Sequence, residues 1–212
     1  MPEKKTRANG RASRKAILAA AADVFAENGY RGTSLTEIAN RVGMTQPGLL
    51  HHFNTKDQLL LAVVEEHEAE SEHASTMMDD LAPENFLLVE SMAKLAASNA
   101  RARLAQLLLT TLSAEAIPLN HPLHEHFVQR YRRFRRGLAA LLERAVESGA
   151  IRSDIDPQEI AREMIATLDG LHLQWLLDPR EINLKKALRA YAERLAQELA
   201  PVTTTSEAAA AV

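Results

Sequence analysis

The chain has 212 residues and a formal net charge of −3, and it contains no cysteine. The missing cysteine excludes disulfides, thiolate metal sites and cysteine catalysis. No apolar run approaches the length of a membrane span, and the basic N-terminus lacks the apolar segment of a secretory signal. Alanine and leucine dominate, while aromatic residues make up only 4%, which favours helices. We therefore expect a cytoplasmic, all-α protein of about nine helices.

The charge is unevenly distributed along the chain. Residues 1–60 hold 9 Lys/Arg and 5 Asp/Glu, whereas the whole chain holds 25 and 28. The first quarter is therefore basic and the remainder is acidic. This division is typical of a polyanion-binding domain that is joined to a separate partner domain.

Residues 1–12 are polar and without apolar periodicity, so we interpret them as a flexible basic arm. Its cations either reach a DNA minor groove or belong to a solvated tail; they are Lys4, Lys5, Arg7 and Arg11. A helix is predicted from about Ser13 to Asn28, where Gly29 ends it. Its apolar face consists of Ile17, Leu18, Ala21, Val24 and Phe25.

Residues 34–58 predict two short helices followed by the start of a third. Apolar residues recur at helical spacing in Leu35, Ile38, Ala39 and Val42. Ser34 and Glu37 form a capping box at the start of this helix, and Gly43 can adopt the left-handed conformation that ends it.

Thr45 offers a second N-cap, and Pro47 sits in the first turn, where its missing N–H has no cost. Leu49 and Phe53, four residues apart, give the second helix a narrow apolar side. Thr55 and Gln58 predict the cap of a third helix. Two short helices joined by a tight glycine turn indicate a helix-turn-helix.

The later elements are all predicted to be helical. We expect helices over about 56–78, 84–99, 101–115, 123–148, 157–177 and 183–199, and a disordered tail over 201–212. We divide the chain into an N-terminal domain, 13–58, and a larger helical domain, 59–200.

The second short helix presents a surface of low charge. With Leu49 and Phe53 facing inward, the helical period turns the opposite side outward, namely Gln46, Pro47, Gly48, Leu50 and His51. One amide, a small gap and apolar atoms can enter a major groove, where the amide can pair with an adenine edge. Affinity would come mainly from contacts with phosphates.

The stretch from Phe25 to Leu60 closely resembles the DNA-binding domain of the TetR family of bacterial regulators. The matching positions are Phe25, Gly29, Tyr30, Thr33, Ser34, Ile38, Ala39, Gly43, Leu49, His52, Phe53, Lys56 and Leu59. The resemblance implies an all-α homodimer, a palindromic operator, and a C-terminal pocket whose small-molecule effector controls DNA affinity. It therefore implies a transcriptional regulator of the repressor type, with a DNA-binding domain over 13–58 and a ligand-binding and dimerisation domain over 59–200.

The resemblance also implies roles for individual residues. Base contacts are expected from Thr36, Gln46, Pro47 and Gly48. Phosphate contacts are expected from Thr33, Thr45, Leu50, His51, His52 and Lys56. The family usually has a tyrosine at the position of Leu50, and leucine cannot donate to a phosphate. Leu50 is therefore expected to touch a thymine methyl group or a sugar instead.

The last two helices resemble the dimerisation pair of the family. The expected interface residues are Leu168, Leu171, Trp175, Leu184, Leu188, Tyr191 and Leu195. Two such helices from each subunit would form a four-helix bundle. The alternative is that these positions form a core within one chain.

The effector pocket is expected between the middle helices. Its candidate lining residues are His67, Met78, Phe86, Met92, Leu108, Phe127, Tyr131, Met164, His172 and Trp175. Methionines with sparse aromatic residues suit an adaptable apolar site, although each residue alone is more typical of a plain core.

No nucleotide-binding loop, zinc-protease spacing or nucleophile motif occurs, so we expect neither enzymatic activity nor a cofactor or metal. Two alternatives remain: a helical metal-dependent enzyme using the His121–His126 cluster, and a non-specific architectural DNA binder. Five arginines in residues 130–136 predict either a solvated, ion-paired surface or a site for an anionic ligand.

Overall fold

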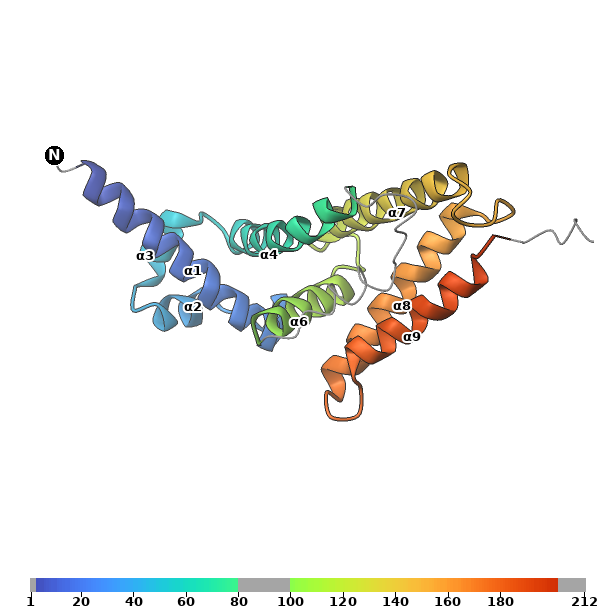
Figure 1. Cartoon of the computed structure of the whole chain (residues 1–212). Coiled ribbons are helices and arrows are strands. Elements are labelled where there is room, and N and C mark those ends of the chain that lie inside the picture. Colours follow the sequence, from blue (N-terminus) through green and yellow to red (C-terminus); the bar gives the residue numbers. More distant parts are fainter. Residues whose placement is uncertain (1–2, 80–99, 202–212) are drawn as a thin grey trace, which may run out of the picture. The chain divides into compact units, whose positions relative to one another are not determined.

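The computed structural model describes residues 3–79 and 100–201, with side chains over 13–68 and 103–201. Eight helices and no strand occur in this part of the chain, which confirms the all-α prediction (Figure 1). They are α1 (Glu3–Gly32), α2 (Leu35–Arg41), α3 (Gln46–His52), α4 (Lys56–Asp79), α6 (Ala100–Glu115), α7 (His124–Glu147), α8 (Pro157–Leu177) and α9 (Leu184–Glu198). The helix predicted over 84–99 and the tail after residue 201 lie outside the described residues. None of the described helices has the length and hydropathy to span a membrane.

Polar caps set the starts of the last two helices, which lie close to the predicted bounds. The Asp156 side chain accepts the N–H groups of Gln158 and Glu159 at 2.8 and 3.3 Å, at the start of α8. Asn183 accepts the N–H of Lys186 at 3.0 Å, at the start of α9. These acceptors satisfy amide groups that have no partner within the helix. The sequence alone therefore predicts where α8 and α9 each begin.

Helix α1 differs from the prediction at its start. It begins at Glu3 rather than Ser13, so most of the expected flexible arm is helical. Lysine, arginine and alanine dominate residues 4–15, and their helix propensity is high even without an apolar face. The predicted stop at Gly29 is present as a kink, because φ is 66° and ψ is −177° at that residue.

The helices form two compact units, described separately. One contains Met1–Ala74 with Ala97–Tyr131, and the other contains Ser75–Ala96 with Arg132–Val212. The first unit extends beyond residue 58 because Leu59, Leu60, Val63 and Val64 of α4 are completely buried in the core shared with α1. These are units of packing, so the functional boundary after residue 58 stays a prediction.

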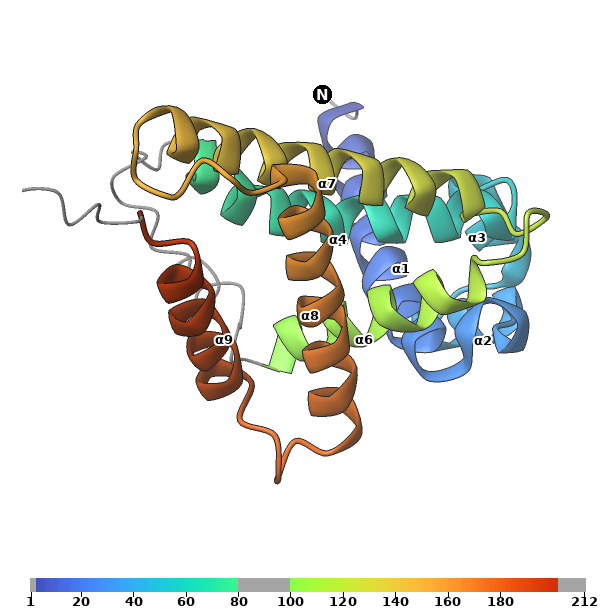
Figure 2. The same cartoon turned by 90° about the vertical axis from the view of Figure 1, so that its right-hand side faces the viewer.

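The core of the first unit extends from the DNA-binding segment into α6. Ile17 and Phe25 of α1 are fully buried together with Leu108 and Leu112 of α6, and α6 packs along α1 (Figure 1). The first turns of α7 lie beside α4 (Figure 2). Burial of a leucine or isoleucine side chain contributes about 1.5–3 kcal/mol, so α6 stabilises the helix-turn-helix region directly.

Helices α8 and α9 pack against each other in the second unit. Their buried side chains include Met164 and Leu168 of α8 and Leu188 and Leu195 of α9. Both helices are therefore amphipathic elements of a core within one chain.

Replacing Gly43 by alanine should lower the free energy of unfolding by about 1–2 kcal/mol, the cost of a left-handed alanine. Its φ is 66°, and no atom lies within 4 Å of the position that a Cβ would occupy. The loss should therefore come from backbone strain without a steric clash. Urea unfolding measures the change.

Gly137→Ala is the matched control, because Gly137 lies in α7 with an equally open Cβ position but without a positive φ. Alanine there should be neutral or stabilising by up to about 1 kcal/mol. Equal effects of the two substitutions would contradict a strained turn at Gly43.

Candidate nucleic-acid interface

Local hydrogen bonds build the predicted helix-turn-helix. Ser34 accepts the N–H of Glu37 at 3.1 Å and starts α2. In the turn, Gly43 is left-handed, and the N–H of Met44 donates to the Ala39 carbonyl at 3.0 Å. Thr45 then accepts the N–H of Gly48 at 3.3 Å and starts α3. Each of these bonds depends on a residue within five positions, which is why the motif is readable in the sequence.

Helix α3 presents the face expected from its periodicity. Leu49 and Phe53 are 0% and 5% exposed, so they hold α3 against the core. The side chains of Gln46, Pro47 and His51 are exposed, whereas Gly48, Leu50 and His52 are partly exposed. The predicted recognition surface is therefore accessible, and its contacts with bases and phosphates stay predictions.

Thr36 and Gln46 interact across the turn. The Thr36 hydroxyl donates to Oε1 of Gln46 at 2.8 Å, and both side chains are exposed. The structure therefore brings together two of the residues expected to contact bases.

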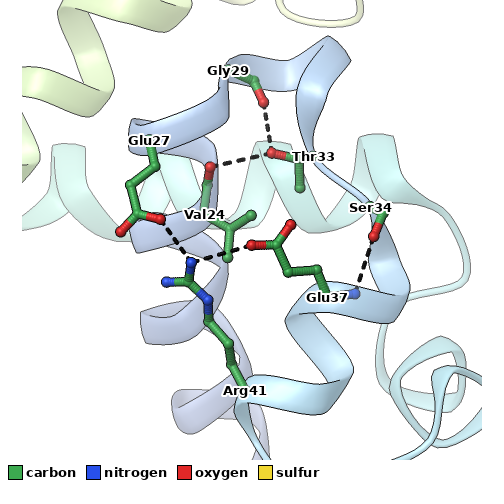
Figure 3. A network of polar contacts seen from close by, with 7 residues as sticks. All are labelled: Val24, Glu27, Gly29, Thr33, Ser34, Glu37 and Arg41. Carbon is green, nitrogen blue, oxygen red and sulfur yellow. Dashed lines mark hydrogen bonds and ion pairs between the residues drawn. The ribbon is translucent and has the colours of Figure 1, made fainter.

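Thr33, which is expected to contact a phosphate, has a buried side chain. Its side chain is 4% exposed, and its hydroxyl donates to the Gly29 carbonyl at 2.6 Å, with the Val24 carbonyl at 3.3 Å (Figure 3). The hydroxyl therefore satisfies carbonyl groups at the kinked end of α1. The sequence pattern does not show where the Gly29 kink turns these carbonyls, and the phosphate contact of Thr33 stays a prediction.

Arg41 joins α2 to α1. Its guanidinium pairs with Glu27 at 2.7 Å and with Glu37 at 3.2 Å (Figure 3). The hydrogen bond from Arg41 lowers the pKa of Glu27. Glu37 thus pairs with Arg41 in addition to supplying its N–H to Ser34. This network fixes the orientation of α2, which carries Thr36.

Tyr30 connects the end of α1 with α4 and α6. Its N–H donates to the Glu115 carboxylate at 2.6 Å, and its hydroxyl donates to Asp57. The Lys56 ammonium lies 4.4 Å from the centre of the Tyr30 ring. Partial burial lowers the pKa of Lys56, while Asp57 and Glu115 oppose the change. Lys56 is therefore held in place at the start of α4.

Arg14 is a candidate phosphate contact that the sequence patterns did not single out. It is exposed, and its guanidinium lies 4.9 Å from the centre of the Phe53 ring, at the C-terminal end of α3. The sequence shows Arg14 as a cation three residues before Ile17, the first residue of the apolar face of α1. Only the folded structure brings Arg14 beside Phe53.

Two family models match the chain. One is described as bacterial regulatory proteins of the tetR family and matches residues 17–63. The other is the C-terminal part of BetI-type transcriptional repressors and matches residues 112–200. Together the two stretches cover more than half of the chain and include both the helix-turn-helix and the C-terminal helices. The chain belongs to the TetR family of transcriptional regulators.

Individual relatives agree with this assignment. The HTH-type transcriptional regulator TtgR of Pseudomonas putida is 25% identical over 189 residues, covering 85% of this chain and 88% of TtgR. The transcriptional activator FasR of Mycolicibacterium smegmatis is 43% identical over 51 residues, covering 24% of this chain and 23% of FasR. The structure of GusR from Salmonella enterica matches with a TM-score of 0.67 at 26% identity, covering 87% and 95% of the two chains.

The pocket candidates of this TetR-family chain fall into both compact units. In the first unit, Leu108 and Phe127 are buried, while His67 and Tyr131 are partly exposed. In the second unit, Met164 and His172 are buried and Trp175 is partly exposed. The side chains of Met78, Phe86 and Met92 lie outside the described residues. The roles of all ten residues stay predictions.

Four of the expected dimer residues belong to the core of their own chain. They are 0–7% exposed in the single chain, and they are Leu168, Leu184, Leu188 and Leu195. These leucines are buried where α8 and α9 pack together, so they cannot also form an outer surface. Leu171, Trp175 and Tyr191 are partly exposed.

Helix α8 has a second apolar stripe, on the side opposite to the buried Leu168. Its members are Ala166, Gly170, Leu173 and Leu177, and the two leucines are 47% and 77% exposed. At 100° per residue, this stripe is about 180° around the helix from Leu168. Nothing lies within 4 Å of the position of a Cβ on Gly170. Helix α8 thus has both an inward apolar face, which contains Leu168, and this outward one, and the predicted dimer contacts stay predictions.

The three histidines of the metal-enzyme alternative have different partners. Nδ1 of His121 accepts the N–H of Leu123 at 3.2 Å, and Nδ1 of His124 lies 2.9 Å from the Ala116 carbonyl. His126 lies 3.1 Å from the Glu68 carboxylate. In the described part of the chain, no group of three or more His, Cys, Asp or Glu residues is arranged to hold a metal.

Glu68 also forms an ion pair with one of the five arginines in residues 130–136. This carboxylate is buried in the first unit, and Nε of Arg130 lies 2.8 Å from its Oε1. Arg132, Arg133 and Arg136 are exposed. Arg130 is thus a structural ion-pair partner between α4 and α7, as the ion-paired alternative expected.

His172 is a buried polar group in the second unit. It is 6% exposed, and its Nδ1 has no hydrogen-bond partner in the described part of the chain. Burial lowers the pKa of His172 to about 4, and the Leu168 carbonyl opposes this change. The ring is therefore neutral at neutral pH, and the loss of solvation is the dominant effect.

The free energy of unfolding should fall as the pH drops from 6.5 towards 4. In this window the unfolded His172 binds a proton while the folded ring does not, so acid favours the unfolded state. A shift from 6.5 to about 4 corresponds to a loss of about 3 kcal/mol. Urea unfolding at pH 7, 6, 5 and 4 measures it.

His172→Leu should flatten this dependence, because the substitution removes the titrating ring. His51→Leu, at an exposed position of α3, should leave it intact. An equal acid loss in wild type and His172→Leu would show that other groups cause it.

Proposed function

We propose that the chain is a ligand-responsive repressor that binds a palindromic operator as a homodimer and releases it when an effector binds the C-terminal helices. The observation that carries this proposal is the capped α2–turn–α3 segment, whose buried Leu49 and Phe53 turn Gln46 outward. The match to a repressor C-terminal region supports the sign of regulation. Such a protein acts where chromosomal DNA is, in the bacterial cytoplasm.

The contacts follow from exposure on and around α3. Bases are read from Gln46, Pro47 and Gly48, with Thr36 beside them. Phosphates are met by Thr45, His51, His52 and Lys56, and by Arg14 in place of the buried Thr33. Leu50 supplies apolar contact only. Because α3 contains no Lys or Arg, affinity depends on groups around the helix.

Dimerisation is proposed through the outward stripe of α8 rather than through the leucines of α9. Gly170 permits a close approach of two helices, while Leu173 and Leu177 offer apolar surface that their own chain leaves exposed. The exposed residues of α9 include Lys185, Lys186 and Arg189, which suit solvent. A two-fold dimer would present two α3 helices to successive major grooves about 34 Å apart.

Tyr30 supplies a path by which α6 can influence α3 within the first unit. Glu115, the last residue of α6, accepts the N–H of Tyr30, and Tyr30 contacts Lys56 and Asp57 at the start of α4. Helix α4 follows α3 after three residues. A shift of the end of α6 on effector binding would therefore reach the DNA-binding surface, and operator DNA must weaken effector binding by the same factor.

An activator is the second candidate, because the 51-residue match at 43% identity is to a protein described as an activator. That match covers only 24% of this chain, so it carries less weight for the sign of regulation than the longer match to a repressor C-terminal region. Transcription from the regulated promoter, with and without the protein, separates the two: a repressor lowers it.

A gel-shift against the DNA upstream of its own gene, with scrambled competitor, tests the main proposal. A specific complex should survive the competitor. Lys56→Gln should weaken binding to all sequences alike and reduce the salt slope by about 0.9, the value for one phosphate contact. Lys185→Gln, at an exposed position of α9, is the matched control and should change neither. If scrambled DNA competes as well as the upstream DNA, the protein is an architectural binder instead.

Leu177→Glu should shift the protein from dimer to monomer, because it places a charge in the apolar stripe of α8. Size-exclusion chromatography with light scattering measures the mass. Glu198→Lys, an exposed charge change near the end of α9, should remain dimeric. A dimer that persists in Leu177→Glu would place the interface elsewhere.

A further inference from the structure

The hydrogen bond between Thr36 and Gln46 lies in the middle of the recognition surface. Thr36 is the second residue of α2, and Gln46 is the first residue of α3. The Thr36 Oγ1 donates to Gln46 Oε1 at 2.8 Å. Neither side chain makes another hydrogen bond or ion pair within the described part of the chain. The bond therefore ties the first residue of the recognition helix to the preceding helix.

The direction of this bond decides which end of the amide is left for DNA. A free glutamine amide pairs with adenine by using both ends, because the adenine edge offers the N6 donor and the N7 acceptor. In this chain one of the two lone pairs of Oε1 already accepts the Thr36 proton, so Oε1 keeps a single acceptor site whose direction is set by Thr36. The end of Gln46 without a protein partner is Nε2, which carries two N–H donors. Guanine offers two adjacent acceptors, O6 and N7, in the major groove.

The surroundings hold both partners in position. Arg41 fixes α2 through Glu27 and Glu37, and the Thr45 cap fixes the start of α3. Pro47 follows Gln46 directly, and a proline restricts the backbone of the residue before it. Since both backbone ends are constrained, the 2.8 Å contact sets the direction of the amide.

The composition of α3 points the same way. Arginine and lysine make most specific contacts with guanine, but α3 reads QPGLLHH and contains neither. Among the first three residues of α3, which are Gln46, Pro47 and Gly48, Gln46 alone has a side-chain donor. Thr36 has given its single proton to Gln46 and can only accept.

We propose that Thr36 determines base specificity by holding the Gln46 amide with Nε2 towards DNA, so that the base pair under Gln46 is read as guanine in preference to adenine. This inference rests on the proposed operator binding. Thr36 thus acts as a positioning residue, and Gln46 makes the base contact.

Operator selection from a randomised palindromic library, followed by sequencing, tests this with the full chain and three variants. Gln46→Ala identifies the position that Gln46 reads, because the preference there should disappear. At that position the wild type should prefer guanine over adenine by about 5-fold to 150-fold, the discrimination of one base contact. Thr36→Val keeps the branched shape but lacks the hydroxyl, so Oε1 becomes free and the guanine-to-adenine ratio should fall by about fivefold or more. Thr36→Ser keeps the donor and should retain the wild-type ratio.

The outcomes separate this inference from the function on which it rests. If no sequence is enriched with the wild type, operator binding itself fails. If an operator is enriched but adenine is preferred at the Gln46 position, the role of Thr36 is overturned. The same holds if Thr36→Val retains the wild-type ratio. Equal thermal midpoints of Thr36→Val and wild type would confirm that a changed ratio reflects readout and not folding.

Discussion

The burial of Leu49 and Phe53 is the constraint on which the recognition surface depends. Both side chains enter a core that also contains Phe25 of α1, Leu60 of α4 and Leu112 of α6. With that side of α3 fixed, the period of the helix turns Gln46 and His51 outward. The same core binds α4 and α6 to the helix-turn-helix, which is why the compact unit extends beyond the DNA-binding segment. A change in this core would therefore alter the DNA-binding surface without touching an exposed residue.

Polar contacts add direction to what apolar burial holds together. The Arg41 pairs orient α2, the Thr33 hydroxyl satisfies carbonyl groups at the kinked end of α1, and Tyr30 joins α1 to the ends of α4 and α6. Exposed ion pairs and single hydrogen bonds contribute little to stability compared with the core. Their importance is geometric, since they fix where donors and acceptors point at the surface that meets DNA.

The sequence predicted the helix-turn-helix closely because its determinants are local. Ser34, Gly43 and Thr45 act on amide groups a few residues away. The burial of individual residues depends instead on partners far apart in the chain. Leu188, a predicted dimer residue, is completely buried in the single chain, whereas Leu177 at the C-terminal end of α8 is 77% exposed. An apolar stripe shows that a helix face is covered, but not by which neighbour.

The sequence by itself determined the all-α class, the caps and turn of the helix-turn-helix, and the resemblance to the TetR family, because helix periodicity and capping act within a few residues. Only the tertiary structure decided that Thr33 is buried, that Arg14 lies against Phe53, and that Thr36 donates to Gln46. These contacts join separate helices, and their geometry is set by how the helices pack. Local sequence patterns thus determined the class of protein, whereas the packing of α2 against α3 determined the direction of the Gln46 amide.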